Sequence, residues 1–419
     1  MKILKKKSQC RLCGCKKLVN SIDLGKSPLA NQFLLKKSKV KKYPLKVLKC
    51  NSCNHLQLSH VINEKKLFSK YLFVSGTSKT NLKHFYEYAK ECSKRFLKKK
   101  SNILDIAAND GSFLNYFNKK NIRVGIDPAK NILPNSELKN YFMENKFFNL
   151  QESKFLKKKY GKFDLITANN VCAHVDKLND FTKGVKNILK TDGVFIFEVG
   201  YFYEVYKNKT FDTIYHEHLD YHLLIPLITF FKKNNMDIFD VKSIPIQGGS
   251  IRIYVSHEGR KKIINRNIIR FIKKEKKINF SNNKIFRDYQ KFINRKKITL
   301  LNKIKFLKNK NFNIAGYGAS AKSTTLLNYF GINSKHLDFI VDLSKLKQFK
   351  YCPGSALKIL PVNEIYKNKI DYLIILSWNF SREIISQNIK FIMMGGKFII
   401  PFPKIEIIEK KNYKKFIYS

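Results

Sequence analysis

The sequence predicts an α/β protein in which a small cysteine-rich module precedes two α/β units joined by helices. Two CxxC pairs lie within residues 1–60, and strand–loop–helix alternation begins at Asn102. A second alternation of the same kind follows a Lys-rich helical stretch. With 419 residues the chain is long enough for several domains. We expect domain limits at 1–75, 76–258, 259–310 (a helical linker) and 311–419.

Short apolar runs separated by turn residues predict the strands of both units. In the first unit they are NILDIA (102–107), RVGID (123–127), FDLITANN (163–170), GVFIFEV (193–199) and a late IRIYVSHE (251–258). In the second unit they are FNIAGYGA (312–319), LDFIVD (337–342), DYLIILSW (371–378) and KFIIPFP (397–403). Helical spacing of apolar residues appears around Leu82 and again between 259 and 310. Alternation of this kind is typical of parallel sheets covered by helices.

The composition indicates a folded protein with a very large positive charge. Hydrophobic residues make up 44% and aromatic residues 13%, which argues against disorder. The 82 Lys and Arg residues exceed the 31 Asp and Glu residues by 51. Lysine is spread along the whole chain together with Ile, Asn and Phe, as codon bias in an AT-rich genome would produce. We favour this explanation over a surface selected to bind nucleic acid or anionic lipid.

The sequence predicts neither membrane insertion nor export. No apolar run reaches the roughly 18 residues that span a bilayer, and the best candidate is Leu223–Phe231. The basic start MKILKKKSQC lacks the apolar stretch of a signal peptide. We therefore expect a cytoplasmic protein whose eight cysteines are metal ligands or buried thiols.

Four cysteines have the spacing of a structural zinc site. They form two CxxC pairs, Cys10 with Cys13 and Cys50 with Cys53. Each CxxC turn supplies two thiolates, so four protein ligands complete a tetrahedron and leave no open position for catalysis. Gly14 and Asn54, which follow the two pairs, suit tight turns. Cys15 is an alternative ligand, and we expect buried thiols at Cys92, Cys172 and Cys352.

The first α/β unit has the features of a nucleoside-binding site. The segment Asp105-Ile-Ala-Ala-Asn-Asp-Gly111 follows a predicted strand, and we expect it to open a helix. Its small residues would let a ligand approach the backbone, and a helix N-terminus offers free N–H groups. Asp127, at the end of the next strand, is placed to accept both ribose hydroxyls. The segment lacks G-x-G-x-x-G, which disfavours a dinucleotide; any doubly wound domain with a turn here is the alternative.

This pattern resembles the S-adenosylmethionine site of class I methyltransferases, with Ala107 where glycine is usual. Together with the CxxC pairs, six further motifs resemble the bacterial sugar C-methyltransferase family in the same order from about 10 to 403. They are VSGTSKTNLKHF (74–85), ITANNVCAHV (166–175), YHEHLDY (215–221), QGGSIRIYV (247–255), AGYGASAKSTTLLNYFGI (315–332) and WNF (378–380). The resemblance implies a class I, Rossmann-like methyltransferase domain, a second Rossmann-like C-terminal domain, S-adenosylmethionine as cofactor, structural Zn²⁺ and a nucleoside-diphosphate ketosugar substrate.

Methylation of carbon requires a base, because a proton beside a carbonyl must leave to form an enolate. Histidine has a suitable pKa for this task. The resemblance assigns the base to His218, with Glu217 and Tyr215 orienting the substrate or hydrogen-bonding the enolate. The cofactor residues it implies are Asp105, Ala107, Asn109, Gly111, Asp127, Asn169 and Asn170. The substrate residues it implies are Tyr71, His174, Tyr221, Arg252, Tyr317 and Lys322, and Phe73 stands where the family often has a tyrosine.

The second α/β unit contains a near P-loop. The segment from Gly316 to Ser323 matches G-x-x-x-x-G-K-[ST] except for Ala321 in place of the second glycine. A phosphate cradle is physically sensible between a strand and a helix. ATP hydrolysis would also need a magnesium-binding acid such as Asp342, and we do not favour it. The resemblance instead implies a domain that closes on the sugar nucleotide, and a purely structural domain is the alternative.

Other functions remain open at this point. YHEHLDY could be a polar loop with satisfied histidines, or His216, His218 and His222 could hold a second zinc ion. An RNA methyltransferase would fit the zinc knuckle and the charge, but no RNA-binding motif and no NPPY motif is present. A zinc-ribbon binding protein with an inert methyltransferase unit is a third possibility. The resemblance makes nucleic acid an unfavoured partner, and oligomeric state leaves no trace in the sequence.

Overall fold

The computed structural model describes residues 3–68, 74–132, 141–260 and 265–418. The chain divides into two compact units, each assembled from separate segments. Unit 1 consists of Met1–Val19, Leu48–Tyr203 and Leu219–Ser281. Unit 2 consists of Asn20–Val47, Glu204–His218 and Asn282–Ser419. The division passes through strands β2 (Leu18–Ser27) and β3 (Tyr43–Cys50) and through helix α5 (Phe202–Lys207).

A seven-stranded sheet forms the centre of unit 1, in the order β12-β13-β10-β9-β6-β7-β8. The strands are β6 (Asn102–Ile106), β7 (Ile122–Ile126), β8 (Phe142–Glu144), β9 (Phe163–Asn169), β10 (Leu189–Gly200), β12 (Met236–Ile244) and β13 (Ser250–His257). The five strands from β8 to β10 are parallel, and β13 lies antiparallel between β10 and β12. The sheet is thus parallel except for one antiparallel strand near an edge, with helices on both faces, which is a Rossmann-like arrangement.

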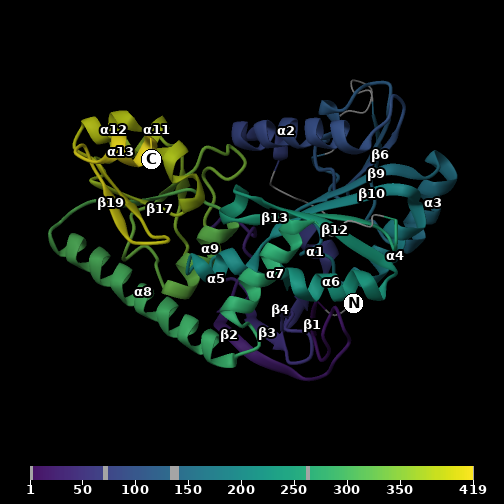
Figure 1. Ribbon diagram of the computed structural model, residues 1–419. Helices are drawn as coiled ribbons and strands as arrows, with labels where there is room; N and C mark the ends of the chain where they lie inside the picture. The colour runs from purple at the N-terminus through teal and green to yellow at the C-terminus, as the bar shows by residue number, and fades with distance from the viewer. Residues whose placement is uncertain (1–2, 69–73, 133–140, 261–264, 419) are drawn as a thin grey trace. The chain divides into compact units, whose positions relative to one another are not determined.

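Alternating side chains of this sheet pack against helices on its two faces. The helices are α2 (Lys79–Phe96), α3 (Leu150–Tyr160), α4 (Leu178–Ile188), α6 (Leu224–Lys233) and α7 (Arg266–Ile278). Val194 and Ile196 of β10 share a core cluster with Tyr88 of α2. Phe197, which points to the opposite face, has its ring 5.6 Å from that of Phe231 in α6. Figure 1 shows α2 and α6 on opposite faces of the sheet.

In the cysteine-rich part of unit 1, the described residues form several short strands and the short helix α1. β1 (Leu4–Lys6) pairs antiparallel with β5 (His60–Ile62), and β4 (Leu56–Leu58) pairs antiparallel with β11 (Asp220–Tyr221). Helix α1 (Glu64–Phe68) follows β5. The β4–β11 pair joins the start of the chain to the residues directly after His218.

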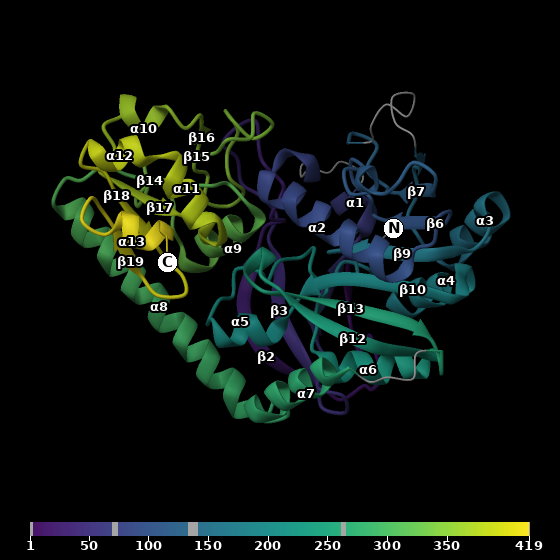
Figure 2. The ribbon, with the colours of Figure 1, turned by 45° about the horizontal axis from the view of Figure 1, so that its top comes forward.

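A six-stranded sheet forms the centre of unit 2, in the order β16-β15-β14-β17-β18-β19. The strands are β14 (Ile314–Tyr317), β15 (Ile340–Val341), β16 (Ile359–Leu360), β17 (Tyr372–Ile375), β18 (Lys397–Ile400) and β19 (Glu406–Ile408), of which only β19 is antiparallel to its neighbour. The helices are α8 (Asn283–Asn309), α9 (Ala321–Phe330), α10 (Glu364–Lys367), α11 (Ser381–Gln387), α12 (Ile389–Met393) and α13 (Tyr413–Tyr418). Figure 2 shows the strands among these helices. The second Rossmann-like fold is therefore confirmed.

Two local expectations differ from the structure. The helix expected after Gly111 is wrong, because only the 3₁₀ turn η2 (Leu114–Tyr116) forms there. Arg123 Nη1 donates to the carbonyls of Leu114 and Phe117, both at 3.2 Å, and these are oxygens that a longer helix would use itself. The Lys-rich stretch is two helices, α7 and α8, separated at Asn279, whose φ of +58° ends α7.

Candidate functional site

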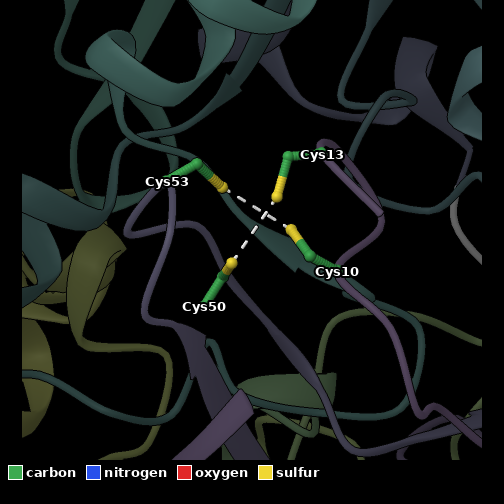
Figure 3. A group of neighbouring side chains, drawn as sticks. All are labelled: Cys10, Cys13, Cys50 and Cys53. Carbon is green, nitrogen blue, oxygen red and sulfur yellow. Dashed lines mark hydrogen bonds between the residues drawn. The ribbon is translucent and has the colours of Figure 1, made fainter. Parts of the chain in front are cut away.

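The four predicted zinc ligands lie together in unit 1. Cys10 Sγ is 3.6 Å from Cys53 Sγ, and Cys13 Sγ is 3.6 Å from Cys50 Sγ. All four sulfur atoms lie within 4.8 Å of one another and point toward a common centre (Figure 3). A tetrahedral zinc ion with Zn–S bonds of about 2.3 Å separates its sulfur ligands by about 3.8 Å, so the cluster fits this metal.

The backbone of each CxxC pair forms the same tight turn. Gly14 N donates to Cys10 O and Asn54 N donates to Cys50 O, both at 2.9 Å. Gly14 and Asn54 have φ angles of +79° and +61°, a region that glycine and asparagine tolerate best. Among the residues that the structure describes, these four cysteines are the one group of three or more candidate ligands close enough to hold a metal.

The remaining cysteines have other environments. Cys15 stands outside the ligand group, and its sulfur accepts a hydrogen bond from Lys17 N at 3.3 Å. Cys92, Cys172 and Cys352 are buried, and burial raises the pKa of each thiol. These three therefore remain neutral thiols in the core, as expected.

The carboxyl ends of β6 and β7 bring the first predicted cofactor residues together. Asp127 Oδ2 accepts from Asn109 N at 2.9 Å, and its Oδ1 accepts from Ala129 N at 2.8 Å. Asp105 Oδ1 accepts from the Thr167 hydroxyl at 2.7 Å, and burial raises the pKa of Asp105 to about 7. Each carboxylate oxygen has two lone pairs, so Asp127 keeps acceptor capacity for a diol.

The loop after β6 brings its backbone close to neighbouring groups. Ala107, Asn109 and Gly111 all have positive φ, at +56°, +54° and +72°. Ala107 therefore adopts the conformation of the glycine that is usual there. A Cβ atom on Gly111 would lie 2.1 Å from the hydroxyl of Tyr141, so only glycine fits. This loop is a tight backbone turn and not the expected N-terminus of a helix.

At the end of β9, Asn169 has buried polar atoms that a bound cofactor would be able to hydrogen bond. Both amide atoms of Asn169 are buried without a hydrogen-bond partner. Asn170 has a φ of +56°, and its N–H donates to Glu198 O at 2.8 Å. A buried amide that makes no hydrogen bond is costly, and a polar ligand would satisfy it. Asn169 lies at the end of β9 beside the loop that follows β6, and its cofactor role stays a prediction.

The motif at 74–85 joins this loop, which the sequence did not reveal. Ser75 N donates to Asn109 Oδ1, and Gly76 N donates to Asp110 Oδ2, both at 2.9 Å. Tyr71 and Phe73 lie outside the described residues, so their predicted roles stay predictions.

Tyr215 and His218 form a hydrogen-bonded pair in unit 2. Tyr215 Oη is 2.8 Å from His218 Nε2, and the two ring centroids are 4.0 Å apart. His218 Nδ1 is 2.8 Å from Thr213 O. Because a carbonyl oxygen can only accept, Nδ1 carries the proton and Nε2 presents its lone pair to the tyrosine hydroxyl. Both side chains are half-buried.

Glu217 and His216 lie deeper than their neighbours. Both carboxylate oxygens of Glu217 accept from Asn31 Nδ2, at 2.8 and 3.0 Å, and burial raises the pKa of Glu217 to about 7. His216 Nε2 lies 3.3 Å from Pro44 O, and its ring contacts Tyr43. His216 is thus a buried histidine in the core of unit 2. Asn31, 186 residues from Glu217, could not be found from the sequence.

Three predicted substrate residues belong to unit 1. The ring of His174 contacts Phe68 edge-on at 5.6 Å, and Tyr221 is buried in β11. Arg252 bonds Glu198 at 2.7 Å and Glu91 at 2.9 Å. The guanidinium is therefore held within the domain, and the substrate roles of all three residues stay predictions.

Arg252 belongs to a network of buried charges that the sequence did not reveal. Its guanidinium also lies 3.4 Å from the ring centre of Tyr88, and His84 Nε2 lies 2.8 Å from Glu198 Oε2. Burial opposes ionisation, but the hydrogen bond from His84 and the charge of Arg252 lower the pKa of Glu198.

The near P-loop of unit 2 uses its N–H groups internally. Ala319 N donates to Asp342 Oδ2 at 2.7 Å. Ser320 and Ser323 cap α9 reciprocally, so their N–H groups are taken as well. Side chains of the domain thus occupy the N–H groups of Ala319, Ser320 and Ser323, and a phosphate cradle at this loop stays a prediction. Asp342 caps this loop through the hydrogen bond from Ala319 N.

The two predicted substrate residues of this domain lie at the same end of its sheet. Tyr317 is buried at the end of β14, and its hydroxyl accepts a long hydrogen bond from Asn388 at 3.4 Å. Lys322 Nζ lies 5.4 Å from the ring centre of Trp378, whose Nε1 donates to Asp212 at 2.6 Å. Burial lowers the pKa of Lys322, while the charge of Asp212 opposes that effect.

Three family models match the chain in order. A zinc binding domain matches residues 10–68, a methyltransferase domain matches 81–234, and a C-methyltransferase C-terminal domain matches 245–403. The C-methyltransferase NovU of Streptomyces niveus is 27% identical over 409 residues, which are 96% of this chain and 97% of that protein. The chain thus carries the zinc binding, methyltransferase and C-methyltransferase C-terminal domains of a S-adenosylmethionine-dependent C-methyltransferase.

Solved structures also resemble part of this C-methyltransferase. A S-adenosylmethionine-dependent methyltransferase from Clostridium acetobutylicum is 18% identical, with a TM-score of 0.31 over 42% of this chain and 92% of that one. A DhpI–SAH complex is 13% identical, with a TM-score of 0.29 over 43% of this chain and 96% of that one.

The C-methyltransferase uses S-adenosylmethionine and carries structural zinc. The predicted cofactor residues lie in unit 1, whereas Tyr215, Glu217 and His218 lie in unit 2. In the described parts of the chain, no helix is both long and apolar enough to cross a membrane.

Proposed function

We propose that this C-methyltransferase methylates a ring carbon beside the carbonyl of a nucleoside-diphosphate keto-deoxysugar, with His218 as the base. The proposal retains the domain limits predicted from the sequence: the zinc-binding domain at 1–75, the methyltransferase domain at 76–258, the helical linker at 259–310 and the C-terminal domain at 311–419. The observation that carries it is the hydrogen-bonded pair of His218 and Tyr215 in the motif that the sugar C-methyltransferases share.

The fixed tautomer suits His218 for proton abstraction. With Nδ1–H held by Thr213 O, the lone pair of Nε2 is the one available to take a proton. A neutral imidazole is an effective base at neutral pH, and such a base contributes roughly 10²–10⁴-fold in rate. The proton that leaves the ring carbon therefore moves to Nε2.

Tyr215 would serve the oxygen of the same substrate. Its hydroxyl hydrogen bonds His218 Nε2 in the free protein, at 2.8 Å. When Nε2 takes the proton from carbon, this hydroxyl turns to the carbonyl oxygen, where negative charge develops. Removing a donor of this kind typically costs roughly 10²–10³-fold in rate. Bound S-adenosylmethionine supplies an electrophilic methyl group to the resulting carbon nucleophile.

Glu217, which directly precedes His218 in the sequence, would have an orienting role. Its carboxyl is buried, and Asn31 donates to both oxygens. With a pKa near 7, the group exchanges a proton near neutral pH and can adjust the charge of the segment when substrate binds. We assign it an orienting role.

The first experiment measures methyl transfer from labelled S-adenosylmethionine to a panel of TDP- and GDP-4-keto-6-deoxysugars, with bulk RNA assayed in parallel. Label on a sugar carbon supports the proposal. Label on RNA alone would contradict it and favour an RNA methyltransferase.

A second experiment isolates the deprotonation step. The enzyme without S-adenosylmethionine is incubated in D₂O with the ketosugar, and exchange at the ring carbon is followed by NMR. His218→Gln should lower both exchange and methyl transfer by roughly 10²-fold or more, with the Kd of S-adenosylmethionine changed less than threefold. His336→Gln, which alters another half-buried histidine of unit 2, is the matched control. Undiminished exchange in His218→Gln would refute the base assignment.

A further inference from the structure

Arg11 lies inside the first zinc knuckle, between Cys10 and Cys13, yet its side chain bonds residues far away in the sequence. Nε donates to Asp220 Oδ2 at 3.0 Å, and Nη1 donates to Asp176 Oδ1 at 2.8 Å. Nη2 donates to the carbonyl of Val175. The Arg11 side chain is 2% exposed and that of Asp220 is fully buried, so the bond between these two is shielded from water.

These acceptors belong to the two segments that carry predicted site residues. Val175 and Asp176 directly follow His174. Asp220 lies two residues after His218. The two segments also bond each other, because Leu219 N donates to Ala173 O at 2.7 Å. One guanidinium thus links the segment 170–176 to the end of the segment 215–221.

The two zinc knuckles, which are the turns of Cys10–Cys13 and Cys50–Cys53, are joined to Asp220 by further contacts. His55 Nε2, two residues after Cys53, lies 2.8 Å from Asp220 Oδ1. Gln57 of β4 is paired in register with Asp220 of β11, and its Oε1 accepts from Arg11 N at 2.8 Å. Both knuckles and β11 therefore form one hydrogen-bonded body within unit 1.

Breaking such a buried pair is costly, which keeps the geometry fixed. Removal of one partner leaves an uncompensated buried charge, and this usually destabilises the local structure strongly. A positioning error of about 1 Å in a reacting group can cost roughly 10²-fold in rate. A rigid metal centre joined to both segments would prevent such errors.

We propose that Arg11 is a positioning residue through which the zinc knuckles fix the segments 170–176 and 219–221 of unit 1 relative to each other. This inference rests on the proposed function, since the segment 219–221 directly continues the 215–218 motif that the proposal assigns to the reaction. It gives the structural zinc a second task besides folding the N-terminal module. The zinc holds these two segments of unit 1 in fixed positions.

The test compares Arg11→Gln with Lys7→Gln. Lys7 Nζ is 2.5 Å from Asp176 Oδ1, so the control removes a cation from the same carboxylate without touching Asp220. For each full-length variant, zinc content, the Kd of S-adenosylmethionine, amide hydrogen exchange and methyl-transfer kinetics are measured.

For Arg11→Gln we expect one zinc per chain, as in the wild type, and a Kd of S-adenosylmethionine changed less than threefold. Exchange of the Leu219 and Asp220 amides should accelerate at least tenfold, and kcat should fall roughly 10- to 100-fold, while KM changes less than threefold. Lys7→Gln should alter none of these by more than threefold. Arg11→Lys, which can bond one carboxylate at a time, should restore part of kcat.

Unchanged exchange at Leu219 and Asp220 in Arg11→Gln, or equal effects in Lys7→Gln, would overturn the inference. If Arg11→Gln loses zinc or fails to fold, Asp220→Asn decides, because it leaves the contacts to Asp176 and Val175 in place. It should accelerate exchange in 215–221 and lower kcat, and normal exchange there overturns the inference. If the wild type methylates no sugar, the proposed function fails. The zinc content and the amide exchange of Arg11→Gln then still test whether Arg11 positions these segments.

Discussion

Replacing Glu217 by Gln is expected to stabilise unit 2 at alkaline pH and to leave its stability nearly unchanged at pH 5. Glu217 is 3% exposed, and burial raises its pKa from 4.5 to about 7, against the hydrogen bonds from Asn31. A carboxyl with a raised pKa binds its proton more tightly in the folded state. Stability is therefore highest at low pH and falls as the pH rises from about 4.5 to about 7.

The size of the effect follows from the shift. A pKa rise of about 2.5 units, at about 1.4 kcal/mol per unit, gives about 3 kcal/mol of destabilisation above pH 7. Gln keeps one of the two contacts with Asn31 and loses the other, which costs about 1 kcal/mol. At pH 8.5 the variant should therefore be more stable by about 2 kcal/mol, whereas at pH 5 gain and loss nearly cancel.

The assay uses Trp378, the only tryptophan in the sequence, which lies in unit 2 with Glu217. Urea unfolding followed by its fluorescence gives the stability of this unit at both pH values. Glu406→Gln, an exposed position on β19, is the control for removing one negative charge. An equal change in stability at pH 5 and pH 8.5 for Glu217→Gln would refute the raised pKa.

The remaining predictions concern unit 1. Gly111→Ala should weaken S-adenosylmethionine binding at least tenfold in calorimetry and lower the stability of unit 1 by roughly 1–3 kcal/mol. The added Cβ atom would clash with Tyr141, and residue 111 has a positive φ that alanine tolerates poorly. Unchanged binding would contradict the role assigned to this tight turn. Asp127→Asn should weaken the same binding roughly 10- to 100-fold, as expected for losing a charged acceptor, with zinc content as the control. Ala107→Gly should raise the stability of unit 1 by about 1 kcal/mol, because it relieves a left-handed φ. Removal of zinc by a chelator should unfold the N-terminal knuckles, since a structural zinc contributes roughly 10 kcal/mol or more, and circular dichroism with metal analysis would show it.

The zinc ligands and the strands could be predicted from the sequence because their signals are local. A CxxC turn contains both ligands and the turn residue within five positions, so Cys10, Cys13 and Gly14 indicate one knuckle by themselves. A buried parallel strand is a short apolar run, and Asp105 and Asp127 end two such runs.

The contacts that hold the predicted site residues in position could not be predicted, because they join residues that are far apart in the sequence. Arg11 and Asp220 are 209 residues apart, and Asn31 and Glu217 are 186 residues apart. Neither pair leaves a spacing or a motif to detect. The same limit explains the wrong helix after Gly111, where the guanidinium of Arg123 occupies the carbonyls that helix would need.

His216 and His218 make the limit concrete, since both are histidines of one motif with the same intrinsic chemistry. The structure separates them by environment: His216 is buried with Nε2 near Pro44 O, whereas His218 is half-buried with Nδ1 on Thr213 O and Nε2 on Tyr215. A base must present a lone pair to a substrate that can reach it. Both rings lie beside a backbone carbonyl, so exposure is what separates them. The resemblance names His218 as the base, and its half-buried position supports that proposal, whereas residue type alone could not decide between the two histidines.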